Sequence, residues 1–259
     1  MQISHATRST PGRGNEDYVA AGPDWAMVLD GATAPAGVSS GCIHDVRWLV
    51  RTLAAALGRR LITAGPGPAD LAPAGPAPLA DLLAGAIAET RDAHAGTCDL
   101  ASPDSPSATV SVARAGNGRL DYLVLCDSPL LLRHRGGQVT LITDDRLARL
   151  TGGGRHGAGL IRAHRNQPGG FWVASTDPGA AYQAVRGSVS LGSVTDAALL
   201  TDGVSRLAEW YGYSWPDIFA RLRDAGPAGL IDLVRSAEMA SPRPGAKQHD
   251  DATAVHLRF

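Results

Sequence analysis

Acidic side chains recur at the points where apolar segments of the chain end. Four short segments place an Asp at the end of an apolar run or in an adjoining turn, and a fifth precedes the last apolar run: Asn15-Glu16-Asp17, Leu29-Asp30-Gly31, Cys126-Asp127-Ser128, Thr201-Asp202-Gly203 and His249-Asp250-Asp251. Carboxylates at strand ends can converge at one edge of a sheet, and because they repel one another a cation normally lies among them. Oxygen-only ligands select hard ions such as Mg²⁺ or Mn²⁺ over zinc.

Each of these segments also has a simpler structural interpretation. A single Asp-Gly pair is more often a turn than a metal ligand, and an Asp beside a helix start is more often a cap. Five segments of one design are less readily explained as coincidence. Gly31, directly after Asp30, would also let its backbone carbonyl approach a metal closely. The metal interpretation therefore depends on the number and order of the segments.

Apolar periodicity predicts the elements that position these acids in the first half of the chain. Residues 25–30 form an apolar run that ends in an acid, as expected of a buried strand that delivers Asp30 to a loop. Apolar positions at helical spacing predict helices over 43–60 and about 79–95. The Pro/Gly-rich stretch between them, 65–78, predicts an exposed loop.

The second half begins as a series of short strand-like runs separated by Gly-rich turns. These runs predict an antiparallel meander with strands at 109–113, 120–126, 130–134 and 139–142. Further strands are predicted at 171–175, 197–201 and 253–259. Residues 147–170 are rich in Gly and polar groups, which predicts a loop with little regular structure. Residues 204–240 predict a helix in two or three pieces, with Ser214 as an N-cap and Pro216 just inside the helix.

This order of elements indicates the fold class. Strand pairs followed by helices and then more strands favour an α+β fold, with antiparallel sheets flanked by helices, over a doubly wound parallel sheet. No strong boundary interrupts the chain, so residues 1–259 are predicted to form a single domain.

Composition excludes several other classes of function. A formal net charge of -1 gives no electrostatic reason to expect a nucleic-acid partner. The only lysine, Lys247, precedes Gln248, so the chain has no P-loop. Cys42, Cys98 and Cys126 lack C-x-x-C spacing and the eight His lack H-x-x-x-H spacing, which argues against a disulfide framework or a zinc site. With no signal peptide and no membrane-spanning apolar run, a cytoplasmic protein is expected.

The order of the acidic motifs resembles that of the type 2C (PPM) metal-dependent protein serine/threonine phosphatases. The similarity runs from about Arg13 to Leu257, and the chain is identified as a divergent, bacterial-type member of that family. Leu141-Ile142-Thr143-Asp144-Asp145 is similar to the family's Leu-Thr-x-Asp-His, and residues 197–203 resemble its Ser-Asp-Gly strand. The resemblance implies two antiparallel β-sheets packed as a sandwich, with helices on both outer faces.

The resemblance also implies the residues of the site. A site for two Mn²⁺ or Mg²⁺ ions, with room for a third, is expected at one end of the sandwich. Its ligands, matched motif by motif, would be Glu16, through metal-bound water, with Asp17, Asp30, the Gly31 carbonyl, Asp127 at the weaker third position, Asp202 and Asp250. Among these, Asp30 and Asp202 are the central catalytic ligands.

Several departures from the family pattern bear on mechanism. Asp30-Gly31-Ala32 lacks the His that often follows and could serve as a general acid. The family's phosphate-binding Arg is replaced by Gly12, so Arg13 is predicted to take its place, with Arg8 a weaker choice. Three further changes lie beside the acids. Asp250-Asp251 replaces the family's Asp-Asn, which leaves open which of the two acids binds metal. Cys126 and Pro129 replace the usual Gly and Arg on either side of Asp127.

Two functions from different classes follow. The first is a phosphoprotein phosphatase acting in signalling, in which a metal-bridging hydroxide attacks phosphorus in line while Arg13 and the metals neutralise the phosphoryl oxygens. Its expected substrate is a phosphorylated target of a kinase, and a monomer is expected. The second is a catalytically weak module that binds a phosphoprotein or regulatory partner. A small phosphorylated molecule is a further candidate substrate. A haloacid dehalogenase-type phosphatase is excluded, because its second Asp would fall at Ala32.

Overall fold

Two five-stranded antiparallel sheets lie face to face in the computed structural model, which describes residues 1–34, 37–64, 77–152, 158–243 and 247–259. The first sheet has the order β1 (Gln2–Arg8), β10 (Ala252–Arg258), β9 (Val194–Leu200), β6 (Leu130–His134) and β7 (Val139–Ile142). The second has the order β2 (Asp17–Ala21), β3 (Trp25–Ala32), β4 (Ser107–Gly116), β5 (Arg119–Leu125) and β8 (Val185–Ser190).

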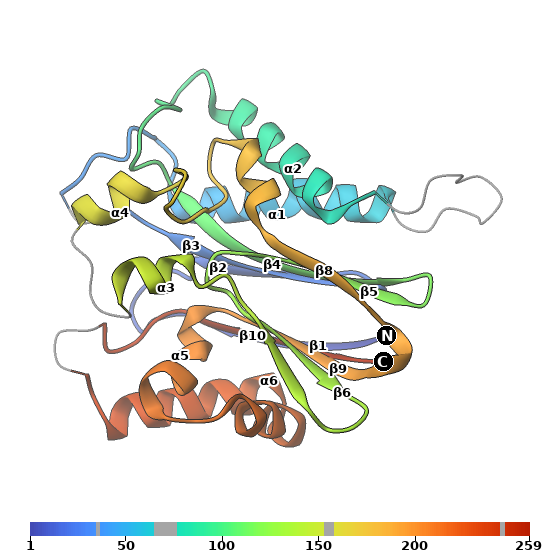
Figure 1. Cartoon of the computed structure of the whole chain (residues 1–259). Coiled ribbons are helices and arrows are strands. Elements are labelled where there is room, and N and C mark those ends of the chain that lie inside the picture. Colours follow the sequence, from blue (N-terminus) through green and yellow to red (C-terminus); the bar gives the residue numbers. More distant parts are fainter. Residues whose placement is uncertain (35–36, 65–76, 153–157, 244–246) are drawn as a thin grey trace.

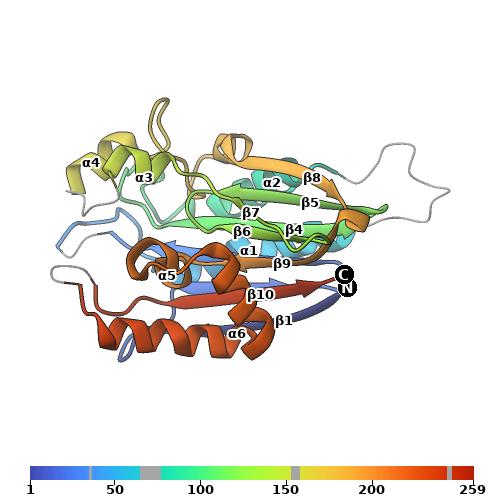
Figure 2. The ribbon, with the colours of Figure 1, turned by 60° about the horizontal axis from the view of Figure 1, so that its bottom comes forward.

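Helices cover the outer face of each sheet (Figure 1). The helices α1 (Val46–Thr63) and α2 (Leu79–His94) pack on the sheet that contains β3, and α5 (Asp202–Tyr211) and α6 (Trp215–Ala240) pack on the other sheet. The short helices α3 (Arg146–Thr151) and α4 (Ala158–His164) lie at one end of the sandwich, and both chain termini lie together at the opposite end (Figure 2). The predicted α+β sandwich with helices on both outer faces is confirmed.

Strand β3 shows why the central strands are apolar throughout. Successive side chains of a strand point to opposite faces of the sheet. Ala26 and Val28 belong to the core between the two sheets, whereas Met27 and Leu29 belong to the core beneath α1 and α2. Because both faces are buried, the run reaches Asp30 without a polar residue, and the acid appears where the strand leaves the core.

The predicted helices agree with the structure within a few residues. Ser214 caps α6 by accepting a hydrogen bond from the Asp217 amide at 3.2 Å, and Pro216 lies in its first turn, as predicted. Gly212 ends α5 in the left-handed conformation, and a second interruption falls at Gly226, whose φ is +72°. The predicted division of residues 204–240 into pieces is therefore confirmed.

Several sequence predictions were wrong or incomplete. Residues 147–170 are not an irregular loop, because α3 and α4 lie within them and pack apolar side chains against Cys126, Phe171 and Val173. Residues 171–175 form only isolated bridges instead of a strand. Strands β1, β2 and β8 were not predicted; they are short or exposed, so they lack a long apolar run. Most of the predicted 65–78 loop, residues 65–76, lies outside the described residues.

Among the helices in the described part of the chain, none combines the length and the apolar character that a membrane crossing requires.

Candidate active site

The first two acids are brought together by strand register. Asp17 begins β2 and Asp30 lies near the end of β3, and the antiparallel pairing makes them direct cross-strand partners. Side chains opposite each other in such a pair have Cβ atoms about 4.5–5.5 Å apart on one face of the sheet. The two carboxylates are therefore neighbours in space, although Asp30 lies 13 positions after Asp17 in the sequence (30 − 17).

Asp17 is held from the opposite sheet. Its Oδ2 accepts hydrogen bonds from the hydroxyls of Thr201 at 2.9 Å and Thr253 at 2.7 Å. Thr201 follows β9 and Thr253 belongs to β10, so these contacts cross between the sheets. The other carboxylate oxygen, Oδ1, is buried with no protein hydrogen-bond partner among the described residues. A buried carboxylate oxygen left without a donor is costly unless a cation or water satisfies it.

Asp202 and Asp250 arrive from the two connections beside β9 and β10. Asp202 is the first residue of α5, directly after Thr201. The next residue must be glycine, because a Cβ at Gly203 would lie 1.8 Å from the Asp251 carbonyl oxygen. This close packing of the α5 N-terminus against the segment before β10 explains why the Thr-Asp-Gly sequence lies beside the His-Asp-Asp sequence.

The pKa values show that these acids share one electrostatic environment. Burial raises the pKa of Asp202 to about 8, and the charges of Asp250, Asp127 and Asp17 add to the rise against the opposing effect of Arg206. Burial likewise raises the pKa of Asp30 well above its ordinary value, with contributions from Asp202, Asp17, Asp127 and Asp250. Clustered carboxylates that disfavour one another's ionisation form a site that a cation would stabilise.

The pKa of Asp17 is raised for the same physical reasons. Burial raises its pKa to about 7, the hydroxyls of Thr253 and Thr201 oppose the rise, and the charges of Asp251 and Asp250 add to it. Asp127 lies in the turn between β5 and β6, and burial raises its pKa as well, with a further increase from Asp144. The five predicted carboxylates at Asp17, Asp30, Asp127, Asp202 and Asp250 thus face a common region.

The structure distinguishes the two acids of the Asp250-Asp251 pair. The two carboxylate oxygens of Asp251 accept hydrogen bonds from the backbone amides of Thr10, at 2.6 Å, and Glu16, at 2.5 Å. Both oxygens of Asp251 therefore position the segment before β2. Asp250 instead faces Asp202 and Asp30 electrostatically. Because two backbone amides occupy the oxygens of Asp251, Asp250 stays the acid of the pair that is predicted to face the metal.

Asp250 is held by a buried ion network that the sequence analysis did not predict. Its Oδ2 accepts from Arg206 at 3.0 Å and its Oδ1 accepts from Lys247 at 2.9 Å. Arg206 is almost fully buried and also pairs with the fully buried Glu238 at 2.8 Å. His249 Nδ1 lies 2.6 Å from Glu238, which joins it to the same network. The one signal visible in the sequence is that Arg206 lies at the start of the predicted helical region 204–240, shortly after Asp202.

Glu16 and Gly31 lie at the side of the acid cluster. The Gly31 amide donates to the Glu16 carbonyl at 3.2 Å, and a Cβ at Gly31 would lie 2.7 Å from that oxygen. The glycine thus allows close approach of the Glu16 backbone, a reason the sequence analysis did not foresee. The Glu16 carboxylate accepts from the Thr33 hydroxyl at 2.9 Å.

The turn at Cys126-Asp127 explains one departure from the family pattern. Cys126 has φ +67°, a conformation that L residues other than Gly, Asn and Asp rarely adopt. Its amide donates to Asp144 Oδ2 at 3.2 Å, and Asp144 pairs with Arg146 at 2.6 Å. The buried Cys126 side chain packs against Phe171 and Val173. Packing in this chain compensates for a backbone conformation that glycine would adopt freely.

A pocket of about 470 Å³ opens over the acids. Asp30, Asp127 and Asp202 line it, and Arg162 and Arg165 line it too. Burial lowers the pKa of Arg165 to about 10, which still leaves it cationic at neutral pH, and its guanidinium donates to Ser175 at 3.0 Å. These two arginines were missed because they belong to the segment predicted to be irregular.

Arg13, the arginine predicted from sequence, lines a neighbouring hollow instead. That hollow also contains Glu16, and Thr33 and Ala34 line both cavities. Arg13 therefore lies beside the acid site and outside the pocket that Asp30 and Asp202 line.

The chemistry of the donors fits hard divalent cations. The set contains only carboxylate oxygens, it includes the unpartnered Oδ1 of Asp17, and its members raise one another's pKa. The described residues contain one group of potential ligands whose ligand atoms all lie within 4.8 Å of one another: Cys42, His44, His94 and Cys98. The carboxylate oxygens are less tightly grouped than these atoms.

The fold is an α+β sandwich of two antiparallel sheets with an acid cluster near the ends of its strands, and comparison with known proteins specifies the family. Residues 4–235 match the family model described as Protein phosphatase 2C, and the chain belongs to that family. No curated protein matches the chain.

Solved structures of bacterial phosphatases share the fold. The Mycobacterium tuberculosis serine/threonine phosphatase PstP/Ppp is 18% identical with a TM-score of 0.64, over 100% of this chain and 98% of that one. The catalytic domain of PstP in complex with two manganese ions is 19% identical with a TM-score of 0.62, over 98% and 96%. Stp1 from Staphylococcus aureus is 14% identical with a TM-score of 0.65, over 100% and 94%.

Proposed function

We propose that this protein is a Mn²⁺- or Mg²⁺-dependent phosphatase that hydrolyses phosphoserine and phosphothreonine in proteins. The observation that carries the proposal is the convergence of five carboxylates, from distant parts of the chain, beneath a pocket that also contains two arginines. Membership of the Protein phosphatase 2C family supports the same activity. One solved structural neighbour contains two manganese ions, which supports the choice of metal.

The chain supplies a ligand set for two ions. Asp17, Asp30, Asp202 and Asp250 would hold them together with the Gly31 carbonyl, while Glu16 and Asp127 lie at the edges of the set. Bound divalent ions supply Lewis-acid activation of water and neutralise charge on the phosphoryl group. Binding would require the carboxylates of Asp17 and Asp202 to lose the protons that their raised pKa values favour.

Other residues of the chain would position the substrate. Arg162 and Arg165 face the pocket that the acids line, and guanidinium groups bind phosphoryl oxygens through paired N–H donors. Asp104 forms an ion pair with Arg162 and therefore orients it. A phosphorylated protein side chain would enter with its phosphoryl group between these arginines and the carboxylates.

Hydrolysis of para-nitrophenyl phosphate and of a phosphothreonine peptide tests this proposal. Purified protein would be assayed with Mn²⁺, with Mg²⁺ and with EDTA, beside Asp30→Asn. Turnover that requires metal and disappears in the variant would establish the phosphatase. A preference for the peptide over small phosphate esters would identify phosphoproteins as the substrate class.

A second function is favoured by a specific observation. Asp250 is already paired with two cationic side chains, and Ala32 takes the place of a general-acid His. Both features would weaken catalysis and suit a module that binds a phosphoprotein without turning it over. Binding of the phosphothreonine peptide without hydrolysis under any metal condition would select this alternative.

A further inference from the structure

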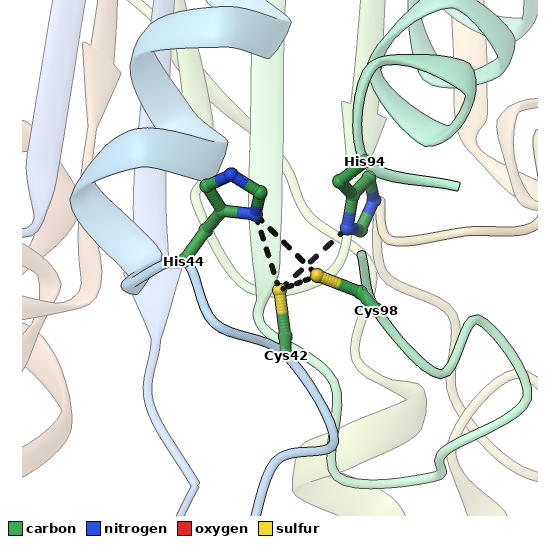
Figure 3. Close-up of side chains that lie close together, drawn as sticks. All are labelled: Cys42, His44, His94 and Cys98. Carbon is green, nitrogen blue, oxygen red and sulfur yellow. Dashed lines mark hydrogen bonds between the residues drawn. The ribbon is translucent and has the colours of Figure 1, made fainter. Parts of the chain in front are cut away.

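Four metal-ligating side chains, none of them part of the carboxylate cluster, meet at the open end of the α1–α2 hairpin. They are Cys42, His44, His94 and Cys98, whose side chains point toward one another in Figure 3. Each offers one ligand atom, and these four atoms all lie within 4.8 Å of one another. His94 is buried, with 3% of its surface exposed, and the other three are half-buried.

Three nitrogen–sulfur distances in this cluster match edges of a tetrahedral zinc site. His44 Nδ1 lies 3.7 Å from Cys42 Sγ and 3.4 Å from Cys98 Sγ, and His94 Nδ1 lies 3.6 Å from Cys42 Sγ. A tetrahedral zinc ion, with Zn–S of about 2.3 Å and Zn–N of about 2.05 Å, has nitrogen–sulfur edges of about 3.5 Å. The two sulfurs are 3.0 Å apart, shorter than the corresponding edge of about 3.8 Å, so a metal would separate them slightly.

The hairpin explains why the sequence spacing did not predict this cluster. His44 lies just before α1, whose N-cap Asp45 accepts the Trp48 amide at 2.8 Å, and His94 is the last residue of α2. Two antiparallel helices of similar length, 18 and 16 residues, return the chain to its starting point. The Cys-x-His motif that ends at His44 and the His-x-x-x-Cys motif that begins at His94 are therefore neighbours in space. In the sequence, residues 45–93, which are 49 residues, lie between them.

Local contacts hold the four side chains in place before any metal binds. The amides of Thr97 and Cys98 both donate to the His94 carbonyl at 3.1 Å, which forms a turn between the two ligands. The His44 ring stacks on Trp48 with 4.0 Å between ring centroids. The Asp99 amide donates to the Gly41 carbonyl at 2.8 Å and joins the two ligand-bearing segments.

We propose that Cys42, His44, His94 and Cys98 bind one structural Zn²⁺ ion. Two sulfurs and two imidazoles form a ligand set that selects zinc over Mg²⁺ or Mn²⁺, which prefer oxygen. Four protein ligands complete a tetrahedral shell and leave no open position, which marks a structural and not a catalytic site. The sequence spacing argued against a zinc site, and this proposal rests instead on a juxtaposition that the spacing does not reveal.

The proposed zinc site joins two segments that line the candidate active site, one beside Glu16 and one above Asp30. The segment that carries Cys42 and His44 also contributes Ser40 to the hollow beside Glu16. The segment after Cys98 contributes Pro103 and Asp104 to the pocket above Asp30. A metal bound between these segments would fix both walls relative to α1 and α2, and its loss would loosen them.

The proposal is tested by measuring the zinc content of the full chain. The protein would be purified under reducing conditions from zinc-supplemented cells and freed of loosely bound metal. About one zinc per chain is expected by mass spectrometry of the metal. Cys42→Ser and Cys98→Ser should each lose most of this zinc. Cys126→Ala, the third cysteine, and Asp30→Asn, in the carboxylate cluster, should retain it. Retention in Asp30→Asn separates this site from the proposed phosphatase site, whatever the activity of that variant.

Cobalt substitution of the wild-type protein gives a measurement that does not depend on the folding of any variant. Co²⁺ bound here should show the intense d–d bands of a tetrahedral site and thiolate-to-cobalt charge transfer. Zinc far below one per chain together with no such spectrum would overturn the proposal. So would a disulfide between Cys42 and Cys98 in freshly purified protein, or zinc that disappears equally in Asp30→Asn.

Discussion

Asp17 and Asp30 are direct partners across the antiparallel pair of β2 and β3, where β2 begins and β3 nears its end. Like charges at opposed positions of a strand pair destabilise the sheet. Burial and the neighbouring acids raise the pKa of both carboxyl groups, so their ionisation is disfavoured in the metal-free protein and a bound cation would stabilise the charged forms.

Asp30→Asn is expected to separate function from stability. Activity should fall by roughly 100-fold or more, since even a residue that only supports a metal ligand is typically worth 10–100-fold. The metal-free variant should be at least as stable as the metal-free wild type, because burial and the neighbouring acids disfavour a charge at Asp30 and the neutral amide removes that cost. Urea unfolding in EDTA, beside the phosphatase assay, measures both effects. A variant that loses activity through unfolding would contradict this account.

Asp30, Asp127 and Asp202 could be predicted from sequence because each lies at or just after the end of an apolar strand. Asp17 and Asp250 lie at the start of β2 and just before β10, so they were predicted from the order of the acidic motifs. Gly31 and Gly203 were visible in sequence, but the backbone oxygens that require them come from Glu16 and Asp251. Those contacts depend on how α5 and β2 pack, which periodicity does not encode. The same limit applies to Arg206, whose partner Glu238 lies on another helix.

Other features were missed for different physical reasons. The exposed edge strand β1 alternates polar and apolar residues too weakly to stand out from a loop. Arg162 and Arg165 follow a Gly-rich stretch whose helices depend on packing against Phe171 and Val173. The Cys42 and Cys98 pair depends on the closure of a helical hairpin. In each case a tertiary contact decided the structure, and the local sequence did not.

The metal-free protein is expected to lose stability as pH rises from about 5.5 to about 8. The folded pKa values of Asp17, about 7, and Asp202, about 8, lie above their ordinary value of 3.8. A carboxyl group with a raised folded pKa takes up protons on folding, so its stabilising contribution is complete at low pH and is lost as pH rises through the folded value. Thermal unfolding in EDTA across this range measures the slope. Equal stability at both ends of the range would contradict the prediction.

Two comparisons locate the origin of that slope. Asp202→Asn should flatten it, because one of the titrating groups is removed. Saturating Mn²⁺ should flatten or reverse it, because metal binds the deprotonated carboxylates and its affinity increases with pH. A slope that persists unchanged in both experiments would assign the pH dependence to groups outside the cluster.

Arg206→Met is expected to weaken metal binding more than the maximal rate. Arg206 holds Asp250 at 3.0 Å, and loss of a residue that orients a ligand typically costs 10–100-fold in metal affinity. The apparent dissociation constant for Mn²⁺ in the phosphatase assay should rise accordingly. Lys247→Met is the matched control, because Lys247 contacts the same carboxylate but is exposed, and its effect should be several-fold smaller. Equal effects of the two substitutions would show that the buried network has no special role.

Substitution of three arginines should decide which of them binds the phosphoryl group. Arg162 and Arg165 line the pocket above Asp30, whereas Arg13 lines the neighbouring hollow with Glu16. A charge-assisted hydrogen bond contributes about 1.5–3 kcal/mol, so Arg162→Gln or Arg165→Gln should lower kcat/KM for a phosphothreonine peptide by about 10-fold or more. Arg149→Gln, at an exposed ion pair with Asp145 outside this pocket, is the control and should be close to wild type. If Arg13→Gln is the damaging change and the other two are silent, the phosphoryl group binds in the hollow beside Glu16, and the family position lost at Gly12 has been replaced by its neighbour.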